Sequence, residues 1–413
     1  MKQTYPPTQA RGAGALFLAL PGSALLASLG TSIANVALPT LSEVFAAPFA
    51  QIQAVIVAYL ATMTVAVVAA GRLGDRFGMK RILVTGLGMF AAASALGALA
   101  GNLGALTSAR ALQGIGGAFM MTTSMALMRQ NAEDKQVGRA MGLLGTVSAL
   151  GTALGPSLGG LLIASFGWRS LFWVQALLAG GTFVLAWLTI PNRARPQASS
   201  ERRGASLDRH LMPHLLTNGM VSAVMMATLV VGPFYLSLGL GLPTSEVGLV
   251  MAAGPLVSVA SGVPCGRLVD AWGHRRTVVG GLGLMLVGLA LLACLPTGAG
   301  TIGYVAAIVI LTPGYQLFQA ANNTAALVGT PQEQRGAAAG WLGFSRNLGL
   351  IAGAWMLGAL FASATGAVEF ACAEAAVIAQ AMRQTFLAAA GLVALAFGIA
   401  WRSRLSRQGA GVP

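Results

Sequence analysis

The sequence predicts an all-α membrane protein with about twelve transmembrane helices in two pseudo-symmetric six-helix halves. Three observations carry this prediction: an apolar composition, repeated hydrophobic stretches of membrane-spanning length, and an internal repeat. Of the 413 residues, 56% are hydrophobic and only 9% are charged, whereas soluble globular domains carry roughly 25% charged residues. The mean hydropathy is +0.74. This composition excludes an ordinary soluble core.

Stretches long enough to cross a bilayer recur from one end of the chain to the other. A hydrocarbon core about 30 Å thick needs roughly 20 apolar residues per helix, and helices satisfy their backbone groups internally. The stretch 13–38 is too long for the apolar region of a signal peptide, so we take it as a retained first span. We expect spans at 13–38, 50–71, 82–101, 103–128, 138–163, 168–190, 212–238, 247–268, 276–296, 301–328, 335–363 and 383–401.

The basic residues predict the orientation. An even number of spans puts both termini on one side, and all but four of the 25 Lys and Arg fall in the termini and the loops on that side. By the positive-inside rule this side is the cytoplasm, so we expect a multi-pass protein of a bacterial-type inner membrane with both termini cytoplasmic. The Arg-rich segment 191–211 reads as a cytoplasmic linker between an N-terminal half, 1–190, and a C-terminal half, 212–413.

The formal net charge of +14 follows from these loops, and a location on one membrane face argues against nucleic acid as a partner. The partners we expect are a small-molecule substrate and the lipid bilayer, with the protein itself monomeric.

Two sets of residues recur in the second half of the chain. Residues 71–81 align with 266–276 at an offset of 195. At an offset of 198, Gly142, Gly145, Gly151 and Gly155 align with Gly340, Gly343, Gly349 and Gly353. Two matches at nearly one offset indicate duplicated halves, an arrangement known from large transporters with a site near the membrane midplane.

The segment 71–81 connects the second and third spans in about ten residues. Its glycines permit a tight turn, and Asp75 can pair with a neighbouring arginine or a helix N-terminus. We therefore predict a conformational latch, although a topogenic loop with solvated charges is the alternative. The residues assigned to the latch are Gly71, Arg72, Asp75, Arg76, Gly78 and Arg81, with Asp270 and Arg276 in the repeat.

A glycine face is predicted in the fifth span. Gly151, Gly155 and Gly159 fall on one side of a helix, where small residues allow close packing between membrane helices. Pro156 interrupts the hydrogen-bond ladder and predicts a kink. Because the second half has Ala354 in place of Pro156, we expect this kink in the first half alone, with a directional role.

These motifs resemble those of the major facilitator superfamily. Residues 71–81 are similar to its signature loop, 109–117 to its fourth-helix motif, 151–160 to the fifth-helix motif of its antiporters, and 29–39 to the first-helix motif of drug:proton antiporters. The resemblance implies the major facilitator fold and alternating access, with export of a small amphiphilic molecule or drug and the proton as coupling ion. It implies transport or coupling roles for Arg110, Gln113, Gly151, Gly155, Pro156 and Gly159.

One position departs from the family pattern. Relatives of this type commonly carry an acidic residue where this chain has Gly30, and all eleven acidic residues of this chain fall in loops or at span ends. Proton relays normally use acids or histidines within the membrane. We therefore assign proton coupling to Asp75 or Glu246, and an exporter or facilitator of an anionic or sugar-like metabolite without classical proton coupling remains the alternative.

Arg346 lies about twelve residues into its span, roughly 18 Å deep at about 1.5 Å per residue. A charge at that depth marks a functional site unless it is a structural arginine bonded to neighbours such as Asn347. Facing a water-filled cavity, Arg346 would attract an anionic or carbonyl-rich solute. The residues expected to line a substrate cavity, each with simple packing as its alternative, are Asn35, Tyr59, Met121, Asn218, Tyr235, Gln316, Gln319, Asn323 and Arg346.

An integral-membrane enzyme is the alternative from another class of protein. The sequence contains no His-Glu-x-x-His zinc motif and no Gly-x-Ser-x-Gly nucleophile elbow. Its three cysteines, Cys265, Cys294 and Cys372, lack the spacing of metal ligands. We therefore expect neither enzymatic activity nor a metal or organic cofactor.

Overall fold

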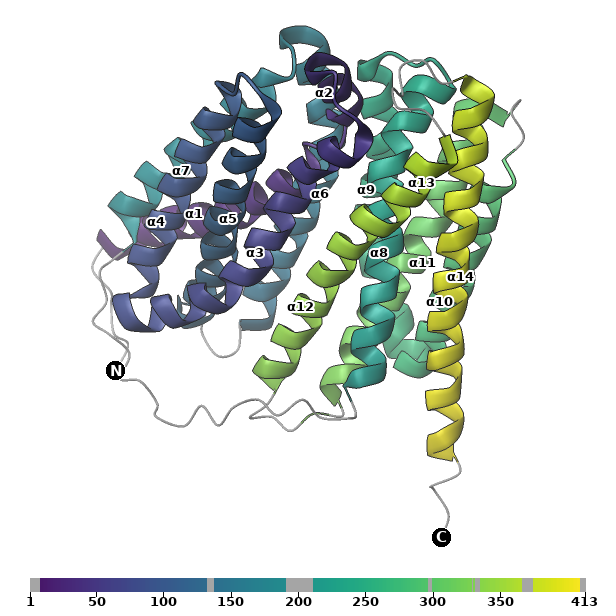
Figure 1. Ribbon diagram of the computed structural model, residues 1–413. Coiled ribbons are helices and arrows are strands. Elements are labelled where there is room, and N and C mark those ends of the chain that lie inside the picture. The colour runs from purple at the N-terminus through teal and green to yellow at the C-terminus, as the bar shows by residue number, and fades with distance from the viewer. Residues whose placement is uncertain are drawn as a thin grey trace. The chain divides into compact units, whose positions relative to one another are not determined.

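The computed structural model describes residues 8–131, 137–190, 211–295, 299–328, 330, 335–365 and 374–408. The elements within these ranges are helical (Figure 1). They are α1 (Thr8–Ser32), α2 (Leu38–Phe45), α3 (Phe49–Phe77), α4 (Met79–Ala98), α5 (Leu103–Asn131), α6 (Val137–Phe166), α7 (Arg169–Thr189), α8 (Met212–Phe234), η1 (Tyr235–Gly239), α9 (Thr244–Trp272), α10 (His274–Ala293), α11 (Gly300–Val328), α12 (Arg335–Ala352), η4 (Gly353–Leu357), α13 (Gly358–Thr365) and α14 (Ala375–Gln408).

Each of the twelve predicted spans corresponds to one helix or to consecutive helices. Among the described residues, nine helices are long and apolar enough to cross a membrane, and α1 and α6 contribute shorter apolar stretches. The predicted all-α membrane fold is confirmed.

The first predicted span, 13–38, is wrong at its end. Helix α1 stops at Ser32, and the chain turns through residues 33–37 before α2 begins. Pro39 lies in the first turn of α2, where its missing N–H removes no helical hydrogen bond. The proline therefore favours a new helix over a continuation of α1. Helix α2 ends at Phe45 and is followed by Ala46, whose φ of +46° is left-handed.

The predicted span 335–363 is not one regular α-helix. A π-helical segment, η4, separates α12 from α13, and a second one, η1, follows α8. Such segments are rare and gather at functional positions, and hydropathy alone carries no signal for them.

The chain divides into two compact units. Unit 1 contains residues 1–34 and 58–200, and unit 2 contains residues 35–57 and 201–413. Unit 2 thus takes in α2 and the start of α3. Of the predicted linker 191–211, only Leu211 lies within the described residues.

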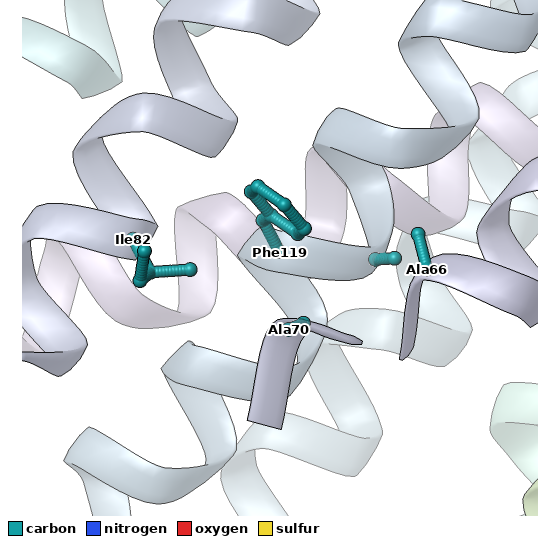
Figure 2. Packing of buried hydrophobic residues seen from close by; sticks show 5 residues of the cluster. Ala66, Ala70, Ile82 and Phe119 are labelled. Carbon is teal, nitrogen blue, oxygen red and sulfur yellow. The ribbon is translucent and has the colours of Figure 1, made fainter. Parts of the chain in front are cut away.

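In unit 1, α4 packs against both α5 and α7, and α1 packs against α6. A hydrophobic cluster joins α3, α4 and α5, and Figure 2 shows Phe119 of α5 among the smaller side chains of its neighbours. Gly86 of α4 makes this approach possible, because a Cβ there would lie 3.0 Å from Gly116 O. The buried residues of the cluster are Ala66, Ala70, Ile82, Ala118 and Phe119.

Unit 2 repeats this packing. Helix α10 packs against α11, and α8 packs against α12 and α14. A Cβ on Gly281 of α10 would lie 2.8 Å from Gly314 O of α11, as one on Gly86 would meet Gly116 of α5. Because Gly281 follows Gly86 at the offset of 195, the sequence repeat is also a repeat of helix packing.

Both copies of the repeated loop turn at a glycine with positive φ. Gly78, between α3 and α4, has φ +98°, and Gly273, between α9 and α10, has φ +77°. Residues with a Cβ rarely adopt these angles. The prediction that glycine permits the tight turn at Gly78 is confirmed.

We expect Gly78→Ala to lower the free energy of unfolding by about 1–3 kcal/mol, because alanine is strained at φ +98° and ψ +135°. Thermal unfolding of the purified protein in detergent measures the effect. Gly101→Ala is the matched control, since Gly101 lies in a short connection without positive φ and has open space around it. Equal stability of the two variants would contradict the prediction.

Candidate functional site

A fully buried arginine forms the centre of a polar network in unit 1. Arg110 of α5 is 0% exposed, and its Nη1 donates to Gln113 Oε1 at 2.9 Å. Its Nη2 donates to the Gly30 carbonyl of α1 at 2.8 Å, and the guanidinium lies 4.3 Å from the centre of the Tyr59 ring. One side chain therefore joins α5 to α1 and α3.

The network extends from Gln113 to two further helices. Gln113 Nε2 donates to Ser94 Oγ of α4 at 2.6 Å and to Gln175 Oε1 of α7 at 3.3 Å. Gln113 and Gln175 are 0% exposed. A buried polar network of this kind stabilises one arrangement of its helices when its members are satisfied.

The network explains why glycine occupies position 30. A Cβ on Gly30 would lie 3.0 Å from the Tyr59 hydroxyl and 3.1 Å from Phe90 Cζ. The Tyr59 hydroxyl is held in place, because it donates to Ala27 O at 2.7 Å. An acidic side chain at position 30 would therefore force Tyr59 or Phe90 to shift. The Gly30 carbonyl accepts a hydrogen bond from Arg110.

The predicted glycine face of α6 packs on the same helix, α1. A Cβ on Gly151 would collide with Leu25 O, and one on Gly155 would collide with Ser32 Oγ and lie 2.9 Å from Ile33 N. Ser148 and Ser28 share a hydrogen bond one turn away. The close contact predicted from small residues is thus present between α6 and α1.

Unit 2 has a corresponding contact between α8 and the run α12–η4. A Cβ on Gly349 would lie 2.8 Å from Gly219 Cα, and one on Gly353 would lie 2.6 Å from Ala223 Cα. The two units differ at the position after the second glycine. Pro156 lies inside the continuous helix α6, whereas its counterpart Ala354 lies in the π-helical segment η4.

Unit 2 has its own polar groups. His214 Nδ1 shares a hydrogen bond of 2.8 Å with Asn322 Oδ1, and Asn218 Nδ2 donates to Leu342 O at 2.8 Å. Gln316 donates to Ser258 of α9. Two buried oxygens, Asn218 Oδ1 and Gln319 Oε1, accept no hydrogen bond from the described residues.

The remaining candidates for the cavity are divided between the units. Tyr59 and Met121 lie in unit 1, and the others lie in unit 2. Asn35 is fully buried and its amide makes no hydrogen bond to the described residues. Tyr235 is buried with its ring 6.1 Å from that of Tyr304. Met121 and Asn323 are half-buried.

Arg346 is exposed on α12. In the part of the chain that the structure describes, no side-chain hydrogen bond joins Arg346 to Asn347, the partner expected if Arg346 were a structural arginine. Its role in attracting a substrate stays a prediction.

The latch residues lie at the ends of helices. The side chains of Arg72, Arg76, Arg81, Asp270 and Arg276 are exposed, whereas Gly71 and Gly78 are half-buried. The Arg76 guanidinium lies 5.2 Å from the centre of the Phe77 ring. The side chain of Asp75 is outside the described part of the chain, so its pairing stays a prediction.

Our reading of the sequence missed three members of the buried network. Ser94 and Gln175 were not assigned a role, although Gln175, as an amide within an otherwise apolar span, carried a usable signal. The Gly30 carbonyl had none, because a backbone acceptor is invisible in a residue pattern. Within the described ranges, no group of three or more His, Cys, Asp or Glu side chains could hold a metal ion.

Comparison with known proteins places this geometry in a family. The sequence profile of the Major Facilitator Superfamily matches residues 22–354. The uncharacterized transporter YebQ of Escherichia coli is 29% identical over 390 residues, covering 80% of this chain and 85% of YebQ. The multidrug resistance protein Stp of Mycobacterium tuberculosis is 38% identical over 158 residues, covering 38% of this chain and 29% of Stp.

A solved structure shares the fold at low sequence identity. The bacterial homologue of the human lysosomal transporter Spinster, in an inward-facing and occupied conformation, superposes with a TM-score of 0.81 at 16% identity. The match covers 97% of this chain and 98% of that one. It supports the fold alone.

Proposed function

Because the chain belongs to the Major Facilitator Superfamily, we propose that this secondary transporter exports a small amphiphilic solute or drug in exchange for protons. The membrane is a bacterial-type inner membrane, and both termini lie in the cytoplasm. Export proceeds by alternating access, with residues 71–81 and 266–276 as the latch on the cytoplasmic side.

The observation that carries this proposal is the convergence of two motifs on one stretch of α1. Gly151 and Gly155, from the segment similar to the antiporter motif, pack against residues 25–33, which form the end of α1 and the first residue after it. Arg110, from the fourth-helix motif, binds the Gly30 carbonyl within the same stretch. A shift of α6 along α1 therefore acts on the helix whose Gly30 carbonyl binds the buried Arg110.

Proton coupling has to use an acid outside the buried network. The described acidic side chains, Glu43, Glu246, Asp270 and Glu374, are exposed near helix ends. We assign the proton to Asp75 or Glu246, as the sequence indicates. The partial likeness to a multidrug resistance protein supports the export direction and the drug-like substrate.

A second candidate function is favoured by Arg346. An exposed arginine well inside α12 is costly in a membrane unless water or an anion reaches it. If a solute anion is its partner, the protein exports or facilitates an anionic or sugar-like metabolite without classical proton coupling.

The experiment that separates the two functions measures proton movement in proteoliposomes. The vesicles contain a pH-sensitive dye, and a panel of anionic, neutral and cationic solutes is added under an imposed pH gradient. We expect one class of amphiphilic solute to drive proton flux, because antiport links the two movements. Asp75→Asn or Glu246→Gln abolishes that flux, whereas Glu43→Gln, another exposed carboxyl, leaves it unchanged.

The opposite outcome is equally specific. Solute movement without proton flux, with anionic solutes preferred and that preference lost in Arg346→Gln, would replace antiport by the second function. Vesicles without protein give the background leak for both measurements.

A further inference from the structure

The start of helix α3 packs with residues far along the chain. Helix α3 spans Phe49–Phe77, yet its residues up to Val57 belong to unit 2, whereas those from Ala58 onward belong to unit 1. Phe49 and Gln53 are four residues apart and share one face of α3. Both are buried, with exposed fractions of 1% and 4%.

Phe49 forms an aromatic cluster within unit 2. Its ring centre lies 5.0 Å from that of Phe234, at the end of α8, in an edge-to-face arrangement, and 5.9 Å from that of Phe361 on α13. Phe234 and Phe361 are themselves 6.3 Å apart and fully buried. These distances lie in the range of attractive aromatic pairs.

Gln53 binds a carbonyl that the irregular helix presents. In a regular α-helix the N–H of Gly358 would donate to Ala354 O. At the end of η4 the Gly358 N–H donates to Trp355 O, and Gln53 Nε2 donates to Ala354 O. The amide of Gln53 thus takes the place of the regular helical donor.

Gly358 provides the space for this contact. A Cβ at this position would collide with Gln53 Nε2 and lie 3.1 Å from Phe49 Cε1. The residue after the π-helical segment must therefore be glycine for Phe49 and Gln53 to dock together. We call the six residues the clasp: Phe49, Gln53, Phe234, Ala354, Gly358 and Phe361.

We infer that Phe49 and Gln53 are positioning residues of the transport cycle. In one conformation they hold the start of α3 against η4 and α13, and in the other conformation they separate from these two segments. The inference rests on alternating access, which is part of the proposed function. By the predicted topology, the clasp lies at the external ends of its helices.

The continuity of α3 is the reason for this assignment. One helix contributes residues to both units, so a movement of one unit against the other either bends α3 or opens the clasp. Helix α3 contains no proline, the usual cause of a sharp bend. We therefore expect the clasp to open while α3 stays straight. The carbonyl that Gln53 binds belongs to η4, and π-helical segments such as η4 gather at functional positions.

The test measures the populations of the two conformations by electron–electron distance measurements in nanodiscs. Spin labels are attached through Gly101→Cys and Glu374→Cys, at exposed positions in unit 1 and unit 2, after serine replaces Cys265, Cys294 and Cys372. The conformation with the open clasp is the one with the longer distance between the two labels. We expect Gln53→Leu to raise the ratio of this population to the short-distance population about fivefold to tenfold, as for the loss of one hydrogen bond.

Gly358→Ala removes the same contact from the other side, without a change in α3. If both substitutions break one contact, the double variant shows the shift of either single variant, because effects on a shared contact do not add. The matched controls are Gln51→Leu, an exposed glutamine two residues from Gln53, and Gly391→Ala, which has open space around it. Both controls keep the original populations.

A purely structural role for the clasp predicts a different result. Gln53→Leu and Gly358→Ala would then lower the unfolding temperature and leave the ratio of the two populations unchanged, and this outcome overturns the inference. The measurement needs no substrate, so its failure is distinct from an absence of solute-driven proton flux, which would instead overturn the antiport proposal.

Discussion

Arg110→Met is expected to reduce transport on the order of 30-fold or more while the protein stays in the membrane. The substitution leaves the Gly30 carbonyl and Gln113 Oε1 without the donors that they have now. Each buried acceptor left unpaired costs about 1–3 kcal/mol, and every 1.4 kcal/mol corresponds to about a factor of ten. Solute flux in proteoliposomes, normalised to the reconstituted protein, measures the effect.

Arg110→Lys separates charge from geometry in the same assay. A lysine keeps the positive charge, but its compact ammonium lacks the planar fork with which arginine reaches Gln113 and Gly30 together. We expect transport by Arg110→Lys to stay low. Arg169→Met is the control, because Arg169 is exposed and donates to Ala100 O at the end of α4. Normal flux in Arg110→Met would remove Arg110 from the mechanism.

Gly155→Leu is expected to lower the free energy of unfolding by about 3 kcal/mol, the upper end of the usual range for overpacked cores. Even the first added carbon would collide with Ser32 Oγ and lie 2.9 Å from Ile33 N, so α6 and α1 have to separate. Denaturant or thermal unfolding of the purified protein, together with its abundance in the membrane, measures the loss.

The repeat supplies a second test of the same argument. Gly353→Leu in unit 2 faces the backbone of Ala223 and is expected to destabilise the protein similarly. Gly180→Leu on α7 is the control for both, because nothing lies within 4 Å of a Cβ built there. Full stability of Gly155→Leu would show that α6 and α1 are further apart than the structure places them.

Hydropathy predicted most of the fold because each membrane helix has to be apolar over about 20 residues whatever its neighbours are. Hydropathy did not predict the breaks within the helices. The end of α1 at Ser32 and the π-helical segment η4 depend on local hydrogen bonding in stretches that are apolar on either side of the break.

The candidate site was predicted unevenly, for a physical reason. Arg110 and Gln113 stood out because a charge or an amide is unusual in a membrane helix. Gly151 and Gly155 stood out because they lie in a segment that resembles a family motif. Phe49 did not stand out, since it lies one residue before the predicted span 50–71 and an apolar side chain there carries no distinctive signal. Gln53, three residues after the start of the predicted span 50–71, was assigned no role.

The sequence by itself determined the helical membrane fold, its duplicated halves and the glycines at the turns, because composition, periodicity and the φ angles open to glycine are local properties of the chain. Only the tertiary structure decided which groups meet. The Gly30 carbonyl binds Arg110, and the Ala354 carbonyl binds Gln53, 301 residues away. Both acceptors are backbone oxygens that every residue possesses, so packing alone selects them.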